Sequence, residues 1–500
     1  MIRSGSEYSA QKRKRINARV PEPNDNFSMT VGNKVIVDAV FRDTGLNDFL
    51  DGLKRNQGER VSNEIKALVS NSIVMTGISV NRLDRLMENI HFRTEYGLGG
   101  GAARSVYRTV ERVGEHSNEI VQFLGRRLKQ SYGVGMDAVF IDWTSMYFEA
   151  PQNDFVRVGY SRDHRPDRPQ VTAGLAMDRD TGMPIGLTVN PGNVMDVTHF
   201  DESFRQIRPL LRKDSMIVFD NGAYSRDNAR MLDEEGMGFV TRQQLNATDD
   251  AFAKTHSDDW IEIDENISYL FREGNLKRRR YMYMNEKLKA DILYRYRCKA
   301  EHDYDEMEEM KQALTKGKRP RKKYRNSNCF VDTRLSYQFP LMGRTRKEAI
   351  EEAVKRMTTG REGLFVLVTN RPLTAEEVLR YYRDRNAVET AFMDLKHGID
   401  WRPARCTKEE SIKGRILISF LALFCMSMIR FLYPQFRSKT AESISEELSS
   451  FTLTVFTKKN GEERRVWSNF GPILRAIFGL KRSVPVPKAG GQTVLDGFRT

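Results

Sequence analysis

Two short apolar runs that each lead into an aspartate constrain the fold of this chain most strongly. Residues 138–141 (Ala-Val-Phe-Ile) precede Asp142, and residues 216–219 (Met-Ile-Val-Phe) precede Asp220. A short apolar run bounded by a turn signal is typical of a buried β-strand. The sequence therefore predicts two buried strands, each with a carboxylate at its end.

The segment between these strands supplies the rest of a layered core. Residues 171–177 and 185–189 have strand character, and the sequence Asp-Thr-Gly at 180–182 between them predicts the turn of a hairpin. Residues 197–211 then show helical periodicity. The predicted order of strand, hairpin, helix and strand indicates an α/β fold with helices on a mixed sheet.

A long helix predicted over residues 375–397 follows a further strand at 363–369. Thr374 and Glu377 have the spacing of a capping box, in which each side chain satisfies the other's backbone N–H. Gly398 is placed to end the helix.

One face of this helix carries a group of polar side chains. Tyr382, Arg385, Glu389 and Lys396 stand at offsets of 0, 3, 7 and 14. At about 100° per residue, these offsets fall within an arc of roughly 60°. The helix can therefore pack by its apolar side and present a carboxylate, a tyrosine and two cations to a cleft. An exposed helix with ion pairs is the alternative, and it explains the positions of Tyr382 and Lys396 less well.

Asp142, Asp220 and Glu389 are our candidate catalytic and metal-binding residues. Carboxylates from two strand ends and a packed helix form the oxygen-ligand set that hard divalent cations require. Two such cations can activate the attacking oxygen and stabilise the leaving oxygen in phosphoryl transfer. A single aspartate at a strand end is usually only a turn former, so the prediction rests on the three acids together.

These motifs resemble those of one family. Tyr382, Arg385, Glu389 and Lys396 resemble the Tyr-Arg-Glu-Lys (YREK) signature of insertion-sequence DDE transposases. They lie in the segment 382–396, Tyr-Arg-Asp-Arg-Asn-Ala-Val-Glu-Thr-Ala-Phe-Met-Asp-Leu-Lys. Asp142 resembles the first acid of that family and Asp220 the second, and residues 159–167 resemble a stretch between those acids in one branch. The sequence departs from the family at Asn386, where a tryptophan is common.

The resemblance implies a ribonuclease H-like catalytic core, interrupted before Glu389 by a mainly β insertion domain. It implies two Mg²⁺ ions, with Mn²⁺ as a substitute, held by the three acids. It also implies cut-and-paste transposition: binding of terminal inverted repeats, DNA cleavage by metal-dependent hydrolysis, and joining of the 3′-hydroxyl ends to target DNA in a synaptic homodimer. Two alternatives remain open, an inactive or domesticated DNA-binding relative and a structure-specific nuclease on the same core.

The charge of the chain agrees with a DNA partner. It has 81 lysines and arginines against 67 aspartates and glutamates, a net charge of +14, and a polyanionic partner is favoured. The apolar stretch 416–429 is shorter than the roughly 20 residues of a membrane span, so we expect a buried core helix and no membrane partner. The four cysteines are scattered and no signal segment is found, so we expect a cytoplasmic protein. The resemblance implies a prokaryotic protein associated with the nucleoid.

Six segments are expected. They are a basic flexible arm at 1–30, a helical DNA-binding region at 31–130, the first part of the catalytic core at 131–244, an insertion domain at 245–362, the second part of the core at 363–435, and a C-terminal region at 436–500. Two helices around residues 76–77 fit a helix-turn-helix or an ordinary helical pair equally well.

Further DNA contacts are expected from positive and aromatic side chains. Arg104 and Arg108 form a basic helical stripe, which is either a phosphate contact or a solvated face. The run Lys277, Arg278, Arg279 and Arg280 favours contact with the DNA backbone. Trp260 is a candidate for base stacking, although a packed tryptophan is the default. Arg385 and Lys396 resemble the phosphate-contacting residues of the family, and Tyr382 accompanies them.

The geometry of the predicted helix selects one carboxylate of three. Only Glu389 shares the arc of Tyr382 and Arg385, whereas Asp384 and Asp394 fall roughly 140° or more from it. We expect Glu389→Gln to abolish cleavage and strand transfer but to preserve DNA binding, as measured by gel assays on labelled DNA. Asp384→Asn and Asp394→Asn should keep activity within about tenfold. An inactive Asp394→Asn variant beside an active Glu389→Gln variant would show that the helix register is wrong.

Overall fold

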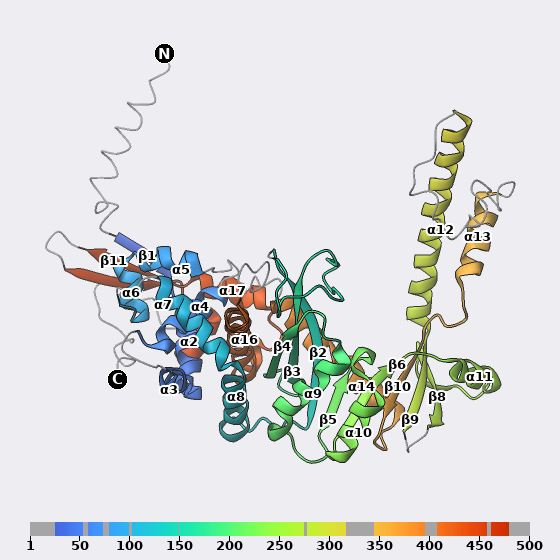
Figure 1. Ribbon diagram of the computed structural model, residues 1–500, viewed down its shortest axis with the longest axis horizontal. Helices are drawn as coiled ribbons and strands as arrows, with labels where there is room; N and C mark the ends of the chain where they lie inside the picture. Colours follow the sequence, from blue (N-terminus) through green and yellow to red (C-terminus); the bar gives the residue numbers. More distant parts are fainter. Residues whose placement is uncertain are drawn as a thin grey trace. The chain divides into compact units, whose positions relative to one another are not determined.

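The computed structural model of the chain describes residues 26–53, 59–73, 80–99, 103–149, 151–274, 278–316, 345–395, 408–457 and 462–479. It contains two compact units (Figure 1). Unit 1 comprises Met1–Ile217 and Arg385–Thr500, and unit 2 comprises Val218–Asp384. Strand β5 (Met216–Phe219) carries the division between them.

The sheet of unit 1 has the strand order β4-β3-β2-β5. Its other strands are β2 (Ala138–Tyr147), β3 (Gln170–Asp178) and β4 (Pro184–Pro191). β2 pairs antiparallel with β3, and β3 pairs antiparallel with β4. The predicted hairpin is thus confirmed. Gly182 in its turn has a φ of 66°, a conformation that glycine adopts without steric cost.

Strand β2 differs from its prediction in length. It continues to Tyr147, so Asp142 lies in the middle of a ten-residue strand and not at its end. The residues beyond Asp142 remain paired because β3 runs alongside them as far as Gln170. The second strand, in contrast, ends at Phe219, and Asp220 follows it as predicted.

Helices cover this sheet. α9 (Asp196–Ile207) packs against β3 and β4, and it continues into a 3₁₀ turn, η2 (Arg208–Leu210), which contains a proline. α15 (Asn386–Met393) packs against β2 and β3. Helices on the strands confirm a mixed α/β architecture for this part of the chain.

A long apolar helix, α16 (Glu409–Leu432), is the core element of unit 1. It packs against α7 (Ala103–Glu115), α4 (Val61–Ile73), α2 (Gly32–Thr44) and β4. Among the described helices, α16 is long and apolar enough to cross a membrane, but 78% of its most apolar window is buried inside the protein. Because a core helix passes the same test, this is weak evidence for a span. The burial agrees with the predicted core helix.

The two terminal regions contribute a small sheet with the order β1-β11-β12. Its strands are β1 (Asn26–Thr30), β11 (Thr452–Thr457) and β12 (Glu463–Ser468), all paired antiparallel. Residues 26–30 were expected in a flexible arm, and this expectation is wrong. Pairing with β11, more than 400 residues away, supplies the hydrogen bonds that the local sequence does not.

The other described helices of unit 1 lie before β2 and near the C-terminus. They are α3 (Leu46–Gly52), α5 (Val80–Met87), α6 (Ile90–Tyr96) and α8 (Ser117–Ser131), followed near the C-terminus by η7 (Pro434–Phe436), α17 (Ala441–Ser450) and α18 (Pro472–Ile477). Helices α4 and α5 lie on either side of the expected turn. The turn at Thr76 and Gly77 lies outside the described residues.

Unit 2 has the strand order β5-β6-β10-β9-β8-β7. Its strands are β6 (Gly238–Gln243), β7 (Ile261–Asp264), β8 (Ile267–Glu273), β9 (Arg279–Asn285) and β10 (Leu364–Thr369). Its helical elements are η3 (Asn221–Ala223), α10 (Arg226–Glu234), α11 (Ala247–Thr255), α12 (Glu286–Thr315), α13 (Arg346–Met357) and α14 (Ala375–Asp384).

The segment predicted as a mainly β insertion is more helical than expected. The described part of 245–362 contains β7, β8 and β9, but the 30 residues of α12 alone outnumber them. α12 and α13 lie side by side (Figure 1) and share a small core of Ala300, Ala349, Ile350 and Ala353. Many residues of α12 are strong helix formers, such as alanine, leucine, methionine, glutamate and lysine, which explains the difference.

The contact between α7 and α16 depends on two glycines. A Cβ on Gly414 would clash with the carbonyl oxygen of Val110, and a Cβ on Gly114 would clash with that of Glu410. We expect Gly414→Ala to lower the free energy of unfolding by about 1–3 kcal/mol, because the helices must separate. Thermal melting of the full chain measures this. Gly52→Ala, in α3 with open space around it, is the matched control and should not destabilise.

Candidate active site

Asp142 owes its position to the alternation of side chains along β2. Trp143, the next residue, lies on the opposite face of the strand, where its ring packs against Phe200 of α9 at 6.0 Å and its Nε1 donates to Ser203 at 3.2 Å. Asp142 accordingly faces the side of the sheet covered by α15. Its Oδ1 accepts a hydrogen bond from the backbone N–H of Trp143 at 2.9 Å. The packing of Trp143 thus fixes the direction of the carboxylate.

Arg385 joins two of the candidate acids within unit 1. Its Nη1 donates to Asp142 Oδ2 at 3.0 Å, and its Nη2 donates to Glu389 Oε1 at 2.7 Å. The Arg385 side chain is 11% exposed, the Asp142 side chain 20% and the Glu389 side chain 50%. Arg385 and Asp142 are thus in contact although they lie 243 positions apart in the chain. The predicted proximity of Arg385 and Glu389 is present, with Arg385 directly before α15 and Glu389 within it.

The helix that carries these residues is divided. The predicted capping box is present at the start of α14: Thr374 N donates to Glu377 Oε2 at 2.8 Å, and Glu377 N donates to Thr374 Oγ1 at 3.3 Å. The helix was expected to continue to 397, but α14 ends at Asp384 and α15 begins at Asn386. Arg385 lies between the two helices. Lys396 and the expected terminator Gly398 lie outside the described residues.

Within unit 2, Asp220 directly follows β5 and begins the 3₁₀ turn η3. The hydroxyl of Tyr382 donates to Asp220 Oδ1 at 3.5 Å, a long hydrogen bond. A cavity of about 450 Å³ lies beside Asp220, with Arg242, Gln243 and Arg361 among its lining residues. The second predicted acid is thus paired with the tyrosine of the motif, at the wall of a polar cavity.

The candidate carboxylates of the two units each suit a divalent cation chemically. Asp142, Asp220 and Glu389 offer only hard oxygen ligands, which Mg²⁺ prefers. Asp142 and Glu389 bind different nitrogens of one guanidinium group, that of Arg385. Among the residues that the structure describes, no group of three or more acidic, histidine or cysteine side chains stands ready to hold a metal ion. In this structure Arg385 provides the positive charge between the two acids of unit 1.

Asp394 is not the surface residue that the sequence suggested. Its side chain is 14% exposed and accepts hydrogen bonds from Arg430 Nη1 at 3.3 Å and Nη2 at 3.4 Å. Burial raises the pKa of Asp394, and the charge and hydrogen bonds of Arg430 lower it only in part. The premise that Asp394→Asn is a surface change is therefore corrected, because the substitution removes the charge partner of a largely buried arginine.

The basic run near 280 is engaged inside unit 2. Arg278 is 9% exposed, forms a two-bond ion pair with Asp233 and lies over the ring of Phe239. Arg280 is equally buried and donates to Asp249 from Nε at 2.8 Å and from Nη2 at 2.6 Å. The expectation that these two arginines contact DNA is corrected, because their charges are already satisfied by carboxylates from other elements.

The other residues that were expected to contact DNA are half-buried, exposed or outside the described part of the chain. Arg279 is half-buried, and its Nη1 donates weakly to the carbonyl of Leu373 at 3.4 Å. Arg108 is exposed on α7, in agreement with either reading of the basic stripe. Trp260 is half-buried just before β7. The side chain of Arg104 and all of Lys277 lie outside the described residues.

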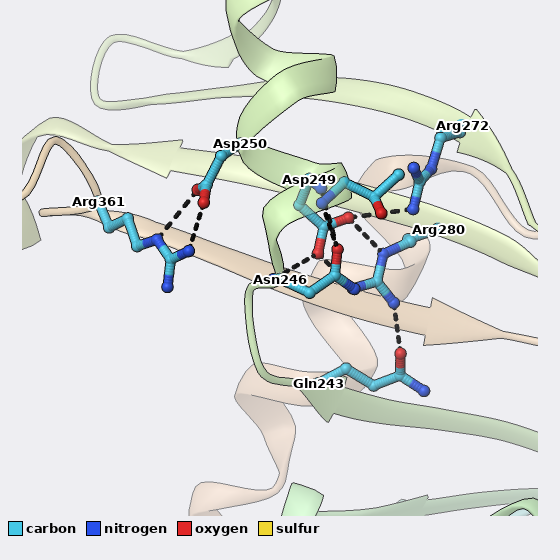
Figure 2. A network of polar contacts seen from close by, with 8 residues as sticks. Gln243, Asn246, Asp249, Asp250, Arg272, Arg280 and Arg361 are labelled. Atoms are coloured by element: carbon cyan, nitrogen blue, oxygen red, sulfur yellow. Dashed lines mark hydrogen bonds and ion pairs between the residues drawn. The ribbon is translucent and has the colours of Figure 1, made fainter.

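A buried charge cluster near this site was not foreseen. Asp249 is 1% exposed at its side chain and binds Arg280 and Arg272, while it also completes the capping box of α11 with Asn246 (Figure 2). Burial alone would raise the pKa of Asp249, but the hydrogen bonds and charges of its partners outweigh it, and the pKa is lowered. The spacing of Asn246 and Asp249 was the available signal, since it is that of a capping box.

Comparison with known proteins identifies the family of the chain. A family model described as the transposase DDE domain matches residues 134–425, more than half of the sequence. The chain belongs to the transposase DDE domain family. Its class is therefore that of a DNA transposase. A search of curated proteins finds no match.

Two solved structures are similar to this chain at low sequence identity. A piggyBac transposase synaptic complex with hairpin DNA has 11% identity and a TM-score of 0.40, and the match covers 83% of this chain and 77% of that chain. A pre-cleavage Mos1 transpososome has 10% identity and a TM-score of 0.13, with 45% of this chain and 70% of that chain covered. The family assignment rests on the sequence match alone.

The depressed pKa of Asp249 makes a testable contribution to stability. We expect Asp249→Asn to lower the free energy of unfolding at pH 7 by about 3 kcal/mol, because Arg280 loses its buried counter-charge. The carboxylate stabilises above its unfolded pKa of about 3.9 and ceases to do so as the pH falls through the lower folded value. The difference in melting temperature between wild type and variant should therefore be constant from pH 6 to 8 and shrink below about pH 4.

Asp250→Asn is the matched control for this measurement. Asp250 is the next residue on α11 and pairs with Arg361, but both side chains are more exposed than those of the Asp249 pair (Figure 2). Water and salt screen such a pair, so its loss should hardly change the melting temperature. Equal effects of the two substitutions would contradict the stabilising role of the buried cluster.

Proposed function

We infer that the chain is the cut-and-paste transposase of an insertion sequence. In this proposal it binds the terminal inverted repeats, cleaves the DNA by metal-dependent hydrolysis and joins the freed 3′-hydroxyl ends to target DNA. The observation that carries the proposal is the bridge from Arg385 to Asp142 and Glu389. Two acids and a cation from distant parts of the sequence converge there, inside the matched transposase domain.

Asp142, Asp220 and Glu389 are the proposed ligands of two Mg²⁺ ions, for which Mn²⁺ can substitute. Bound metal would polarise the phosphate and lower the pKa of the attacking water or 3′-hydroxyl. The protein's own part is to hold the carboxylates in place. Trp143 orients the strand that carries Asp142, the end of β5 presents Asp220, and α15 presents Glu389.

Cationic and aromatic residues of the motif are proposed to bind the DNA end. The planar guanidinium of Arg385 matches the geometry of a phosphate as well as that of a carboxylate. While it contacts Asp142 and Glu389, it also offsets the mutual repulsion of these two acids. Tyr382 is proposed to hold Asp220 through its hydroxyl, and Lys396 to contact phosphate.

Double-stranded DNA, as terminal repeats and as target, is the proposed partner, and the net charge of +14 supports it. Transposition joins two ends in one event, so we propose a homodimer for the synaptic complex. The proposed setting is the cytoplasm of a prokaryotic cell, where the nucleoid is accessible. The resemblance to the family motivates the proposed dimer and the proposed cellular setting.

An end-joining assay tests the proposal. Labelled duplexes that tile the DNA on both sides of the chain's own gene are incubated with the protein, a target plasmid and Mg²⁺. We expect cleavage at the element ends and labelled plasmid, with similar products in Mn²⁺. Ca²⁺ should support binding without efficient turnover, because its looser coordination does not fit the transition state.

The products separate the proposed function from its alternatives. Shifted DNA without cleavage indicates a domesticated binding protein, and cleavage without joining indicates a nuclease. Glu389→Gln should bind but neither cut nor join, whereas the matched variant Asp384→Asn, on the neighbouring helix, should do all three. Full activity in a chelator would overturn the metal-dependent mechanism.

A further inference from the structure

One wall of the cavity beside Asp220 is held by a relay, here the hydrogen-bonded series of side chains Asp249, Arg280 and Gln243. The cavity, about 450 Å³, lies within unit 2 and is lined by Arg242, Gln243, Gln244 and Arg361 as well as by Asp220. Gln243 is the last residue of β6, and its backbone pairs with Val366 of β10. Its side chain is half-buried. One polar side chain of the wall is therefore anchored on a strand that belongs to the sheet.

The orientation of the Gln243 amide is determined by its partner. Its Oε1 accepts a hydrogen bond from Nη1 of Arg280 (Figure 2). A guanidinium group carries donors only, so the amide oxygen must face it and the amide nitrogen cannot. The two N–H donors of Gln243 are consequently turned away from Arg280. Chemistry alone thus removes the usual ambiguity between the oxygen and the nitrogen of a glutamine.

Arg280 is itself held rigidly. Its side chain is 10% exposed and forms two hydrogen bonds with Asp249, whose side chain is 1% exposed. Asp249 also accepts from Nη2 of Arg272 at 3.1 Å and from the backbone N–H of Asn246 at 3.0 Å. Every member of the relay from Asp249 to Gln243 is therefore fixed by at least one charge-assisted bond.

We propose that this cavity is a phosphate subsite for the DNA strand processed at Asp220, in which the amide N–H groups of Gln243 donate to a non-bridging phosphate oxygen. The inference rests on the proposed function and deepens it. Gln243 is the DNA-contacting residue of the subsite. Arg280 and Asp249 are positioning residues that act through the Gln243 amide.

The surroundings favour a phosphate over a base edge. Arg242 is exposed and lines the same cavity, which gives the subsite a positive charge beside the amide donors. Arg361 lines it too, with its charge shared with Asp250. A phosphate presents only acceptors, and it is matched by donors and positive charge. Base edges that combine donors and acceptors match this wall less well.

Reversal of the polarity of Gln243 tests the subsite. Gln243→Glu keeps the shape of the side chain and gives Arg280 a charged partner, so the melting temperature should not fall. It also replaces the N–H donors with an acceptor oxygen that repels phosphate. Binding is measured in Ca²⁺ with the labelled duplexes that flank the chain's gene. We expect the affinity to fall by about tenfold or more. The matched control Gln312→Glu, at an exposed position of α12 outside the cavity lining, should change it by less than about threefold.

A second measurement identifies the contacted group. Duplexes that carry a single neutral methylphosphonate linkage are scanned along the processed strand. We expect one linkage to weaken binding by the wild type but not by Gln243→Ala, since the contact is already lost in that variant. Equal effects of Gln243→Glu and Gln312→Glu, or a scan without such a coupled linkage, would overturn the subsite. Absence of any DNA binding by the wild type would instead overturn the proposed function.

Discussion

Arg385 connects the two structural elements on which the candidate site of unit 1 depends. Its guanidinium group binds Asp142 on β2 and Glu389 on α15, with nitrogen–oxygen distances of 3.0 and 2.7 Å. Two carboxylates held near each other repel, and a largely buried cation between them offsets that repulsion. The same arrangement that stabilises the packing of α15 on the sheet therefore also keeps two potential metal ligands together. A structural ion pair and a candidate catalytic site share one set of atoms here.

Charges in unit 2 serve a different purpose. Arg278 and Arg280 are paired with Asp233 and Asp249 and are almost completely buried, although they belong to the most basic run of the described sequence. A buried ion pair adds little net stability compared with apolar packing, but it fixes the geometry of its members. In this unit the fixed geometry reaches Gln243, whose amide direction follows from that of Arg280. The buried ion pairs of unit 2 therefore determine the orientation of their side chains more than they add to the stability of the fold.

Much of the core was predictable because its signals are local. The apolar run before Asp220, the turn of the β3–β4 hairpin and the capping box at Thr374 and Glu377 each depend on neighbouring residues. The resemblance to the Tyr-Arg-Glu-Lys signature indicated the candidate acids, and the helical offsets correctly predicted that Arg385 lies beside Glu389. The division of the helix at Arg385 was not predictable, since each half has the same periodicity and only the tertiary contacts differ.

The sequence by itself determined which segments of the core are strands and helices, and it indicated the candidate acids and the family to which the chain is similar. Backbone preferences and apolar periodicity depend on a few neighbouring residues, so a short segment of the sequence is enough to recognise them. Tertiary structure alone decided that residues 26–30 form a strand with β11, that Asp394 is paired with Arg430, and that Arg280 is buried against Asp249. A charged side chain is equally compatible with water, DNA or a carboxylate, and only the fold brings one of these partners within hydrogen-bonding distance.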